Sequence, residues 1–140
     1  MDDQCYTAAV LLERMVRDTY LDKKSSAIQP LQWSILRRLK SEHPNRPDLT
    51  NLARYLDLTL PPVSRAVVTL EKRGLIKKLP QEDKRAVAVS LTEKGFAALE
   101  SDPINELAAS IKQLPDSDAS HFITCVRDMV VQNSVPGALK

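Results

Sequence analysis

The chain has 140 residues, with 20 lysines and arginines against 18 acidic residues and 43% hydrophobic residues. This length suits one domain, or one domain with an added assembly element. Aromatic residues make up only 4% of it, so we expect an aliphatic core. No apolar run reaches membrane-spanning length and no leader opens the chain, so we expect a cytoplasmic protein without membrane contact. The two cysteines, Cys5 and Cys125, lie at opposite ends, which excludes a disulfide framework.

Positive charge is concentrated in one part of the chain. From Arg46 to Arg85, nine lysines and arginines stand against five acidic residues, a net charge of +4, whereas the rest has eleven against thirteen, a net charge of −2. A basic stretch of this kind is typical of a surface that binds nucleic acid. A solvated charged face is the alternative interpretation.

The first elements in chain order are expected to be helices. Apolar residues at helical spacing predict a first helix over residues 3–23. A second helix is expected to begin at Pro30, since proline is well suited to a first helical position. The proline-containing segment 43–47 then ends this helix.

The middle of the chain has the pattern of two short helices joined by a tight turn. Asp48 and Thr59 are the expected N-caps of these helices, and Gly74 is the expected stop of the second. Ala53 is small enough to let the helices approach each other, and Asp57 tolerates the left-handed conformation that the turn requires. The pattern predicts a helix-turn-helix.

A β-hairpin is expected next. Leu75–Pro80 and Ala86–Leu91 flank a polar, charged tip, which is typical of two paired strands and their turn. Thr92 is expected to cap the following helix. Pro103 should interrupt that helix, with Asp102 as the cap of its restart.

The outer helices carry apolar stripes, although the central part is already a compact unit. The last of these helices is expected to open at Asp116 or Ser117. We predict a mainly α-helical fold with a small β-hairpin wing, in which residues 29–99 form a winged helix-turn-helix domain. Residues 1–28 and 100–140 are then dimerisation helices of a homodimer. Packing of these helices on one another within a monomer is the alternative.

Two segments carry a resemblance to a known family, LTNLARYLDLTLPPVSRAVVTLEKRGLIKK and EDKRAVAVSLTEKG. With these segments, the chain resembles the MarR family of winged helix-turn-helix transcription regulators over nearly its whole length. The resemblance implies a homodimer that binds a pseudo-palindromic operator in double-stranded DNA, usually as a repressor released by a small ligand or by oxidation. The chain departs from the family at Asp57, where glycine is more usual, at Pro61 and Pro62, which open the recognition helix, and at Pro103.

The recognition helix is expected to place its N-terminal residues in the major groove. Arg65 is suited to two hydrogen bonds with guanine or, failing that, to a phosphate contact, and an ion pair with Glu71 or an aspartate is the alternative. Pro61 has no N–H group and is left with apolar contacts, for instance to a thymine methyl. The expected DNA-binding residues of this helix are Thr59, Pro61, Ser64, Arg65, Thr69 and Lys72.

The tip of the hairpin is the second expected DNA contact. Lys84 and Arg85 are expected to reach the minor groove or the flanking phosphates, because narrow grooves attract arginine. Asp83 is expected to orient these basic groups rather than touch DNA. A solvated charged turn is the alternative. Weaker candidates for phosphate contacts are Arg46, Arg54, Lys77 and Lys78.

A cleft for a small-molecule effector of unknown identity is expected between the dimer helices and the DNA-reading part. Its expected lining is Tyr6, Met15, Trp33 and Arg37. Ordinary core packing is the alternative for Trp33. The resemblance also suggests a redox role for Cys5, because some relatives carry a sensing cysteine in the first helix, but Asp2 and Asp3 oppose the lowered thiol pKa that a sensor needs.

Neither metal chemistry nor catalysis is expected. His121 and Cys125 share a helix face, but they lack a recognised metal-ligand spacing and are better explained as helix residues. The chain has three glycines and no nucleophile motif or phosphate-binding loop, so we expect no enzyme activity and no cofactor. The alternative function is a winged-helix module for protein–protein contact without a specific DNA target.

Overall fold

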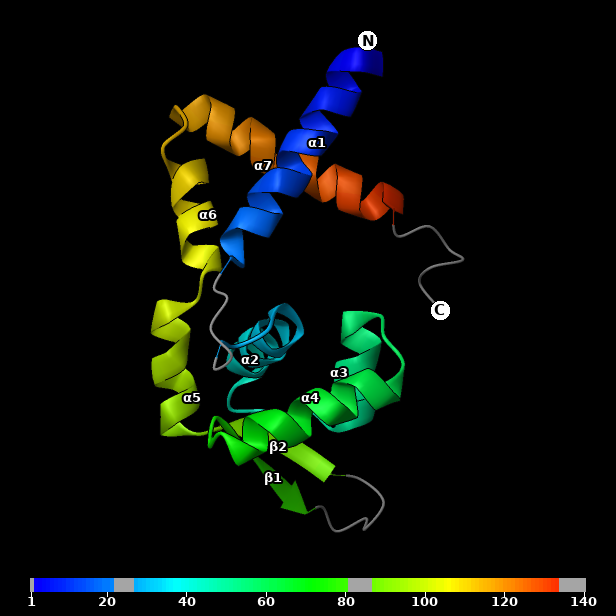
Figure 1. Ribbon diagram of the computed structural model, residues 1–140, viewed down its shortest axis with the longest axis vertical. Coiled ribbons are helices and arrows are strands. Elements are labelled where there is room, and N and C mark those ends of the chain that lie inside the picture. The colour runs from blue at the N-terminus through cyan, green and yellow to red at the C-terminus, as the bar shows by residue number, and fades with distance from the viewer. Residues whose placement is uncertain (1, 22–26, 81–86, 134–140) are drawn as a thin grey trace. The chain divides into compact units, whose positions relative to one another are not determined.

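The structure is a computed structural model that describes residues 2–21, 27–80 and 87–133. In this part of the chain it contains seven α-helices and one two-stranded antiparallel sheet, so the predicted fold class is confirmed. Two compact units are formed, one by residues 22–102 and one by residues 1–21 with 103–140. In the first unit the helices α2, α3 and α4 pack on one another and on the hairpin (Figure 1).

Helix α2 (Pro30–Glu42) is the central helix of the first unit. It begins at the proline that the sequence predicted, and the amide of Gln29 donates to Oε1 of Gln32 at 3.0 Å, which closes the first turn. Ile35 and Leu36 on its inner face are completely buried. These residues anchor α2 in the core, against α4 and β2.

The predicted helix pair consists of α3 (Leu49–Leu56) and α4 (Leu60–Lys72). Asp48 caps α3 as predicted, because its Oδ1 accepts a hydrogen bond of 2.8 Å from the amide of Asn51. Asp57 lies between the helices with φ 57° and ψ 44°, which is the left-handed conformation expected for the turn. The helix-turn-helix therefore forms where the sequence predicts it.

The wing is built on β1 (Ile76–Pro80) and β2 (Val87–Leu91), which pair with Ile76 opposite Leu91. It is followed at once by α5 (Glu93–Ala98). The hydroxyl of Thr92 donates to the carbonyl of Gly74 at 2.6 Å and accepts from the amide of Gly95 at 3.1 Å. Thr92 is therefore the predicted cap of α5, and it also ties this helix to the segment before β1.

A glycine is required where α5 meets that segment. A Cβ atom on Gly95 would lie 2.1 Å from the carbonyl oxygen of Leu75 and 2.9 Å from Cδ2 of Leu91. Gly74, directly before Leu75, has φ +77°, but a Cβ atom there would make only an ordinary van der Waals contact, 3.8 Å from Cδ of Lys94. The two glycines are thus needed for different reasons, one for close packing and one for backbone conformation.

The chain leaves the first unit through a short 3₁₀ turn, η1 (Leu99–Ser101), and continues in α6 (Ile104–Lys112). The predicted interruption at Pro103 is present, since Pro103 directly precedes α6. The N-cap position of α6 is Pro103 and not the predicted Asp102. The carboxylate of Asp102 binds the guanidinium of Arg37 at 2.7 Å.

The core of the first unit is aliphatic, as the composition predicts. Trp33 is its one tryptophan and is only 7% exposed, so the core-packing interpretation of this residue is correct. The largest completely buried side chains are those of Ile35, Leu36, Leu52, Val63, Val67, Leu70, Ile76 and Val89. They come from α2, α3, α4 and the hairpin, and they hold these elements together.

The second unit consists of α1 (Asp2–Thr19), α6 and α7 (Asp116–Asn133), and both α1 and α7 contact α6. Helix α1 ends before the predicted residue 23. None of the buried hydrophobic residues belongs to the described part of this unit. Its large exposed hydrophobic residues include Tyr6, Val10, Leu11, Met15 and Val16 on α1 and Ile123, Val126, Met129 and Val130 on α7.

Candidate nucleic-acid interface

Helix α4 has one face in the core and one face at the surface. Val63, Val67 and Leu70 are completely buried, and this row of apolar residues at helical spacing fixes the rotation of the helix about its axis. Of the predicted DNA-binding residues, Ser64 is half-buried and the others on this helix segment are exposed: Thr59, Pro61, Arg65, Thr69 and Lys72.

Thr59 occupies the N-cap position of α4 as predicted, but its side chain makes no capping hydrogen bond. An N-cap hydroxyl normally accepts from the second or third residue of the helix. In α4 these are Pro61 and Pro62, which have no N–H group. The hydroxyl of Thr59 is therefore exposed at the start of the helix and is not used for capping.

Arg65 lies on the exposed side of α4, and its guanidinium makes no ion pair with any residue that the structure describes. The predicted alternative, an ion pair with Glu71, is not formed, because Glu71 pairs with Nζ of Lys78 at 3.7 Å. The hydroxyl of Thr69 donates to the carbonyl of Arg65 at 3.2 Å and keeps only its acceptor function for a partner. Arg65 is thus a cation at the surface that is available for a partner.

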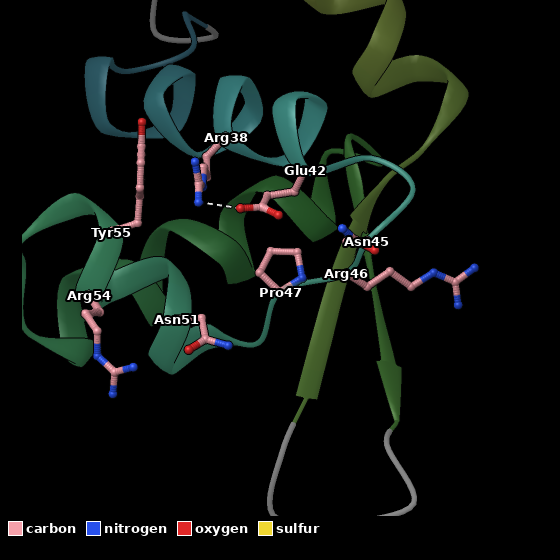
Figure 2. A pocket seen from close by; sticks show the side chains of 8 residues that line it. All are labelled: Arg38, Glu42, Asn45, Arg46, Pro47, Asn51, Arg54 and Tyr55. Atoms are coloured by element: carbon pink, nitrogen blue, oxygen red, sulfur yellow. Dashed lines mark ion pairs between the residues drawn. The ribbon is translucent and has the colours of Figure 1, made fainter.

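A second basic area lies beside α3, around an open hollow of about 520 Å³. Figure 2 shows that Arg46, Asn51 and Arg54 come from α3 and the loop before it, and that the two arginines extend outward. Neither arginine has an ion pair within the described ranges. From the sequence alone both arginines were weaker candidates for phosphate contacts, because the hollow that they line is formed only when α2 packs beside α3.

The other arginine of this hollow is held in place. Arg38 forms an ion pair with Glu42, and its Cζ lies 3.7 Å from the centroid of the Tyr55 ring (Figure 2). A guanidinium stacked on an aromatic face is stabilised by cation–π attraction. Arg38 therefore links α2 to α3, whereas Arg46 and Arg54 provide the free positive charge.

The loop before α3 is joined to the wing by its backbone. The amide of Val89 donates to the carbonyl of Pro47 at 3.0 Å, and Asp48 forms an isolated β-bridge with Ala88. Lys77 is exposed on β1. The predicted DNA contacts of the wing tip, Lys84 and Arg85, and the predicted orienting residue Asp83 lie outside the residues that the structure describes.

Comparisons with known proteins agree with this arrangement. Residues 28–95 match the family model of a winged helix DNA-binding domain. No curated protein sequence matches the chain.

Several solved structures share the fold. A MarR family transcriptional regulator from Streptomyces coelicolor, solved in complex with DNA, has a TM-score of 0.75 at 20% identity, with 96% of this chain and 88% of that chain covered. A mutant of MepR from S. aureus, bound to an oligodeoxyribonucleotide, has a TM-score of 0.62 at 20% identity, covering 92% and 96%. PcaV from Streptomyces coelicolor, solved with its natural ligand, has a TM-score of 0.68 at 19% identity, covering 88% and 89%.

The chain has the winged-helix fold of these solved structures. The resemblance stated from the sequence is therefore confirmed at the level of the fold. In this fold, α3 and α4 are the helix-turn-helix, and β1 and β2 are the base of the wing.

The four residues predicted to line an effector cleft do not all belong to one unit. Tyr6 and Met15 belong to one compact unit, and Trp33 and Arg37 belong to the other. Tyr6 is 74% and Met15 41% exposed, whereas Trp33 is in the core and Arg37 is bound to Asp102. The four residues therefore have very different surroundings.

The two cysteines of the chain also have different surroundings. Cys5 is exposed on α1. The Sγ of Cys125 lies 3.7 Å from Nε2 of His121, one helical turn away. Among the described residues no group of three or more potential metal ligands is found. None of the helices described is long and apolar enough to cross a membrane.

Proposed function

We propose that this protein is a sequence-specific DNA-binding transcription regulator of the MarR family, most simply a repressor. It acts as a homodimer on a pseudo-palindromic operator. Residues 29–99 bind DNA, and residues 1–28 with 100–140 form the dimer. The observation that carries the proposal is Arg65, a cation without an ion pair among the described residues, on the exposed face of a helix-turn-helix second helix.

The basic area beside α3 supports the same assignment. In helix-turn-helix proteins the first helix crosses the DNA backbone while the second lies in the major groove. Arg54 lies on this first helix and Arg46 lies just before it, so both are placed to contact phosphates. Phosphate contacts set the position of the protein on the duplex, and base contacts select the sequence.

The proposal of a homodimer depends on the second unit. Helices α1 and α7 expose many large apolar side chains, among them Val16 at 51% and Val130 at 58%. Apolar surface on this scale is typical of an interface rather than of a monomer surface. A second copy of the chain, with the same two helices, covers these faces in the proposed dimer.

The proposal includes release of DNA by a small ligand or by oxidation. PcaV, which shares the fold, was solved with its natural ligand, and this supports regulation by a small molecule. Cys5 is exposed, so its thiol is accessible to an oxidant.

The test is a selection of DNA fragments by the purified protein at near-physiological salt. The expected result is a palindrome whose half-sites lie about 10 base pairs apart, one helical turn. Arg65→Ala is expected to lose about 1–3 kcal/mol of discrimination between bases. Arg127→Ala is the matched control, because Arg127 is an exposed arginine of α7 that is not among the residues proposed to bind DNA.

Affinity for the selected DNA should fall linearly with salt concentration on logarithmic axes, because bound phosphates release counterions. If the parent protein enriches no DNA sequence more strongly than Arg65→Ala does, the proposal is contradicted. Such a result would instead favour a winged-helix module for protein contact.

A further inference from the structure

The exposed side of α4 carries apolar and basic side chains in alternation. With 3.6 residues per turn, the positions directly opposite the buried residues Val63, Val67 and Leu70 form a single row along the helix. All members of this row are exposed, and Val68 is 36% exposed although it is purely apolar. We call it the outer ridge of α4, and it consists of Pro61, Arg65, Val68 and Lys72.

The start of α4 has fewer hydrogen-bond donors than a usual helix N-terminus. Such an end normally presents free backbone N–H groups to acceptors and anions. Here the second and third residues, Pro61 and Pro62, have no N–H group, so the backbone N–H of Leu60 remains, and the Leu60 side chain is apolar and 45% exposed. This end of the helix is therefore less polar than a usual helix N-terminus.

The major groove contains one apolar group that matches such a surface. Guanine, adenine and cytosine present hydrogen-bonding atoms there, while thymine adds its C5-methyl group. The cations of the ridge, Arg65 and Lys72, are complementary to DNA charge and to guanine. A surface that alternates apolar and basic groups therefore fits a half-site containing both thymine and guanine.

We infer that the outer ridge of α4 selects operator half-sites by their thymine methyl groups, which contact Pro61 and Val68. Arg65 binds guanine or phosphate between them. Val68 is seven positions after Pro61, which is about 10 Å along a helix, the length of about three base-pair steps. The inference rests on the proposed function and adds to it the chemical group that is read.

The test replaces thymine by deoxyuridine, which lacks only the methyl group. The probe is the duplex selected by the protein, with single deoxyuridine substitutions at each thymine of one half-site. We expect about fourfold weaker binding at the contacted positions, the effect of one buried methyl group. Deoxyuridine outside the half-sites should have no effect.

Protein variants assign the contacts. With Val68→Ala, the penalty at one deoxyuridine position should disappear, because the two changes remove the same contact and are then not additive. Val68→Thr keeps one methyl group and should retain part of the penalty. Pro61→Ser, which restores an N–H group and adds a hydroxyl, should remove the penalty at a second position. Val131→Ala is the matched control, since Val131 is 70% exposed on α7.

The possible results separate this inference from the proposed function. Specific binding with equal affinity for thymine and deoxyuridine duplexes would overturn the inference and leave the proposed function intact. A selected half-site without thymine would do the same. Deoxyuridine penalties that persist unchanged in Val68→Ala and Pro61→Ser would also overturn it. Absence of any sequence-specific binding would overturn both.

Discussion

The guanidinium of Arg37 holds the carboxylate of Asp102 with two hydrogen bonds, Nε to Oδ2 at 2.7 Å and Nη2 to Oδ1 at 2.8 Å. The Asp102 side chain is only 5% exposed, and that of Arg37 is 28% exposed. Asp102 is also the last residue of the unit formed by residues 22–102. The pair therefore fixes the end of η1 to α2, directly before the chain passes into α6.

Asp102→Ala should lower the free energy of unfolding by about 3 kcal/mol, because it removes one partner of a largely buried ion pair. Denaturant unfolding followed by circular dichroism measures this change. The control is Glu13→Ala, which removes the exposed pair with Arg17 and should cost less than about 1 kcal/mol. Equal effects of the two substitutions would show that the Arg37–Asp102 pair does not stabilise the fold.

Gly95→Ala should destabilise the first unit by about 3 kcal/mol, because the added Cβ would overlap the Leu75 carbonyl and force the backbone apart. Gly74→Ala should cost about 1 kcal/mol, since only its left-handed conformation is strained. Thermal unfolding of the two variants side by side checks the order. The reverse order would mean that the junction between α5 and the hairpin relaxes easily.

Asp57→Gly should leave the protein as stable or make it slightly more stable, because glycine adopts φ 57° without strain. Asp57→Val should destabilise it by about 1–2 kcal/mol, since a β-branched residue is poorly tolerated in the left-handed region. Both values come from denaturant midpoints. Equal stability of the valine variant and the parent would contradict the role of this turn.

Arg54→Gln should weaken DNA binding similarly for all sequences and reduce the slope of log affinity against log salt by about 1, because one phosphate contact is lost. Arg46→Gln should behave in the same way. Fluorescence anisotropy at several salt concentrations gives the slope. Arg127→Gln on α7 should keep the parent slope, and an unchanged slope in all three variants would remove the hollow from the interface.

Val126→Asp should shift the protein from dimer to monomer, because it places a charge in the centre of the apolar stripe of α7. Val126 is 40% exposed in the single chain, and burying an unpaired carboxylate in an interface is costly. Sedimentation velocity over a concentration series measures the change. Val131→Asp, on the other side of the same helix, should remain a dimer; a monomeric parent would contradict the proposed assembly.

Local signals in the sequence were sufficient to predict most of the helices and strands of the first unit. Asp48 as a cap, Asp57 in the left-handed turn and the stop after α4 each depend on residues within one helical turn. The two runs Leu75–Pro80 and Ala86–Leu91, on either side of a polar tip, predicted the hairpin to within one residue at the outer ends of its strands. Such features are readable because their partners are close in sequence.

Contacts between distant residues were not predictable in this way. Asp102 looks like a helix cap from its neighbours, but its partner, Arg37, is 65 residues away. The hollow beside α3 likewise needs the fold to bring Arg38 of α2 to the same hollow as Arg54 of α3. The absence of a capping bond at Thr59 could have been predicted from the sequence, because both possible donors are prolines. That prediction needs the hydrogen-bond pattern of an N-cap and the missing N–H group of proline to be considered together.

The backbone bonds from Pro47 to Val89 and from Asp48 to Ala88 join the start of α3 to the wing. The distance between the two parts of the surface is thus set by main-chain atoms, which every amino-acid sequence shares. Exchanging side chains on α4 can therefore change which bases are chosen while the spacing of the contacts stays the same. Retargeting such a protein to a new operator requires new surface residues on an unchanged frame.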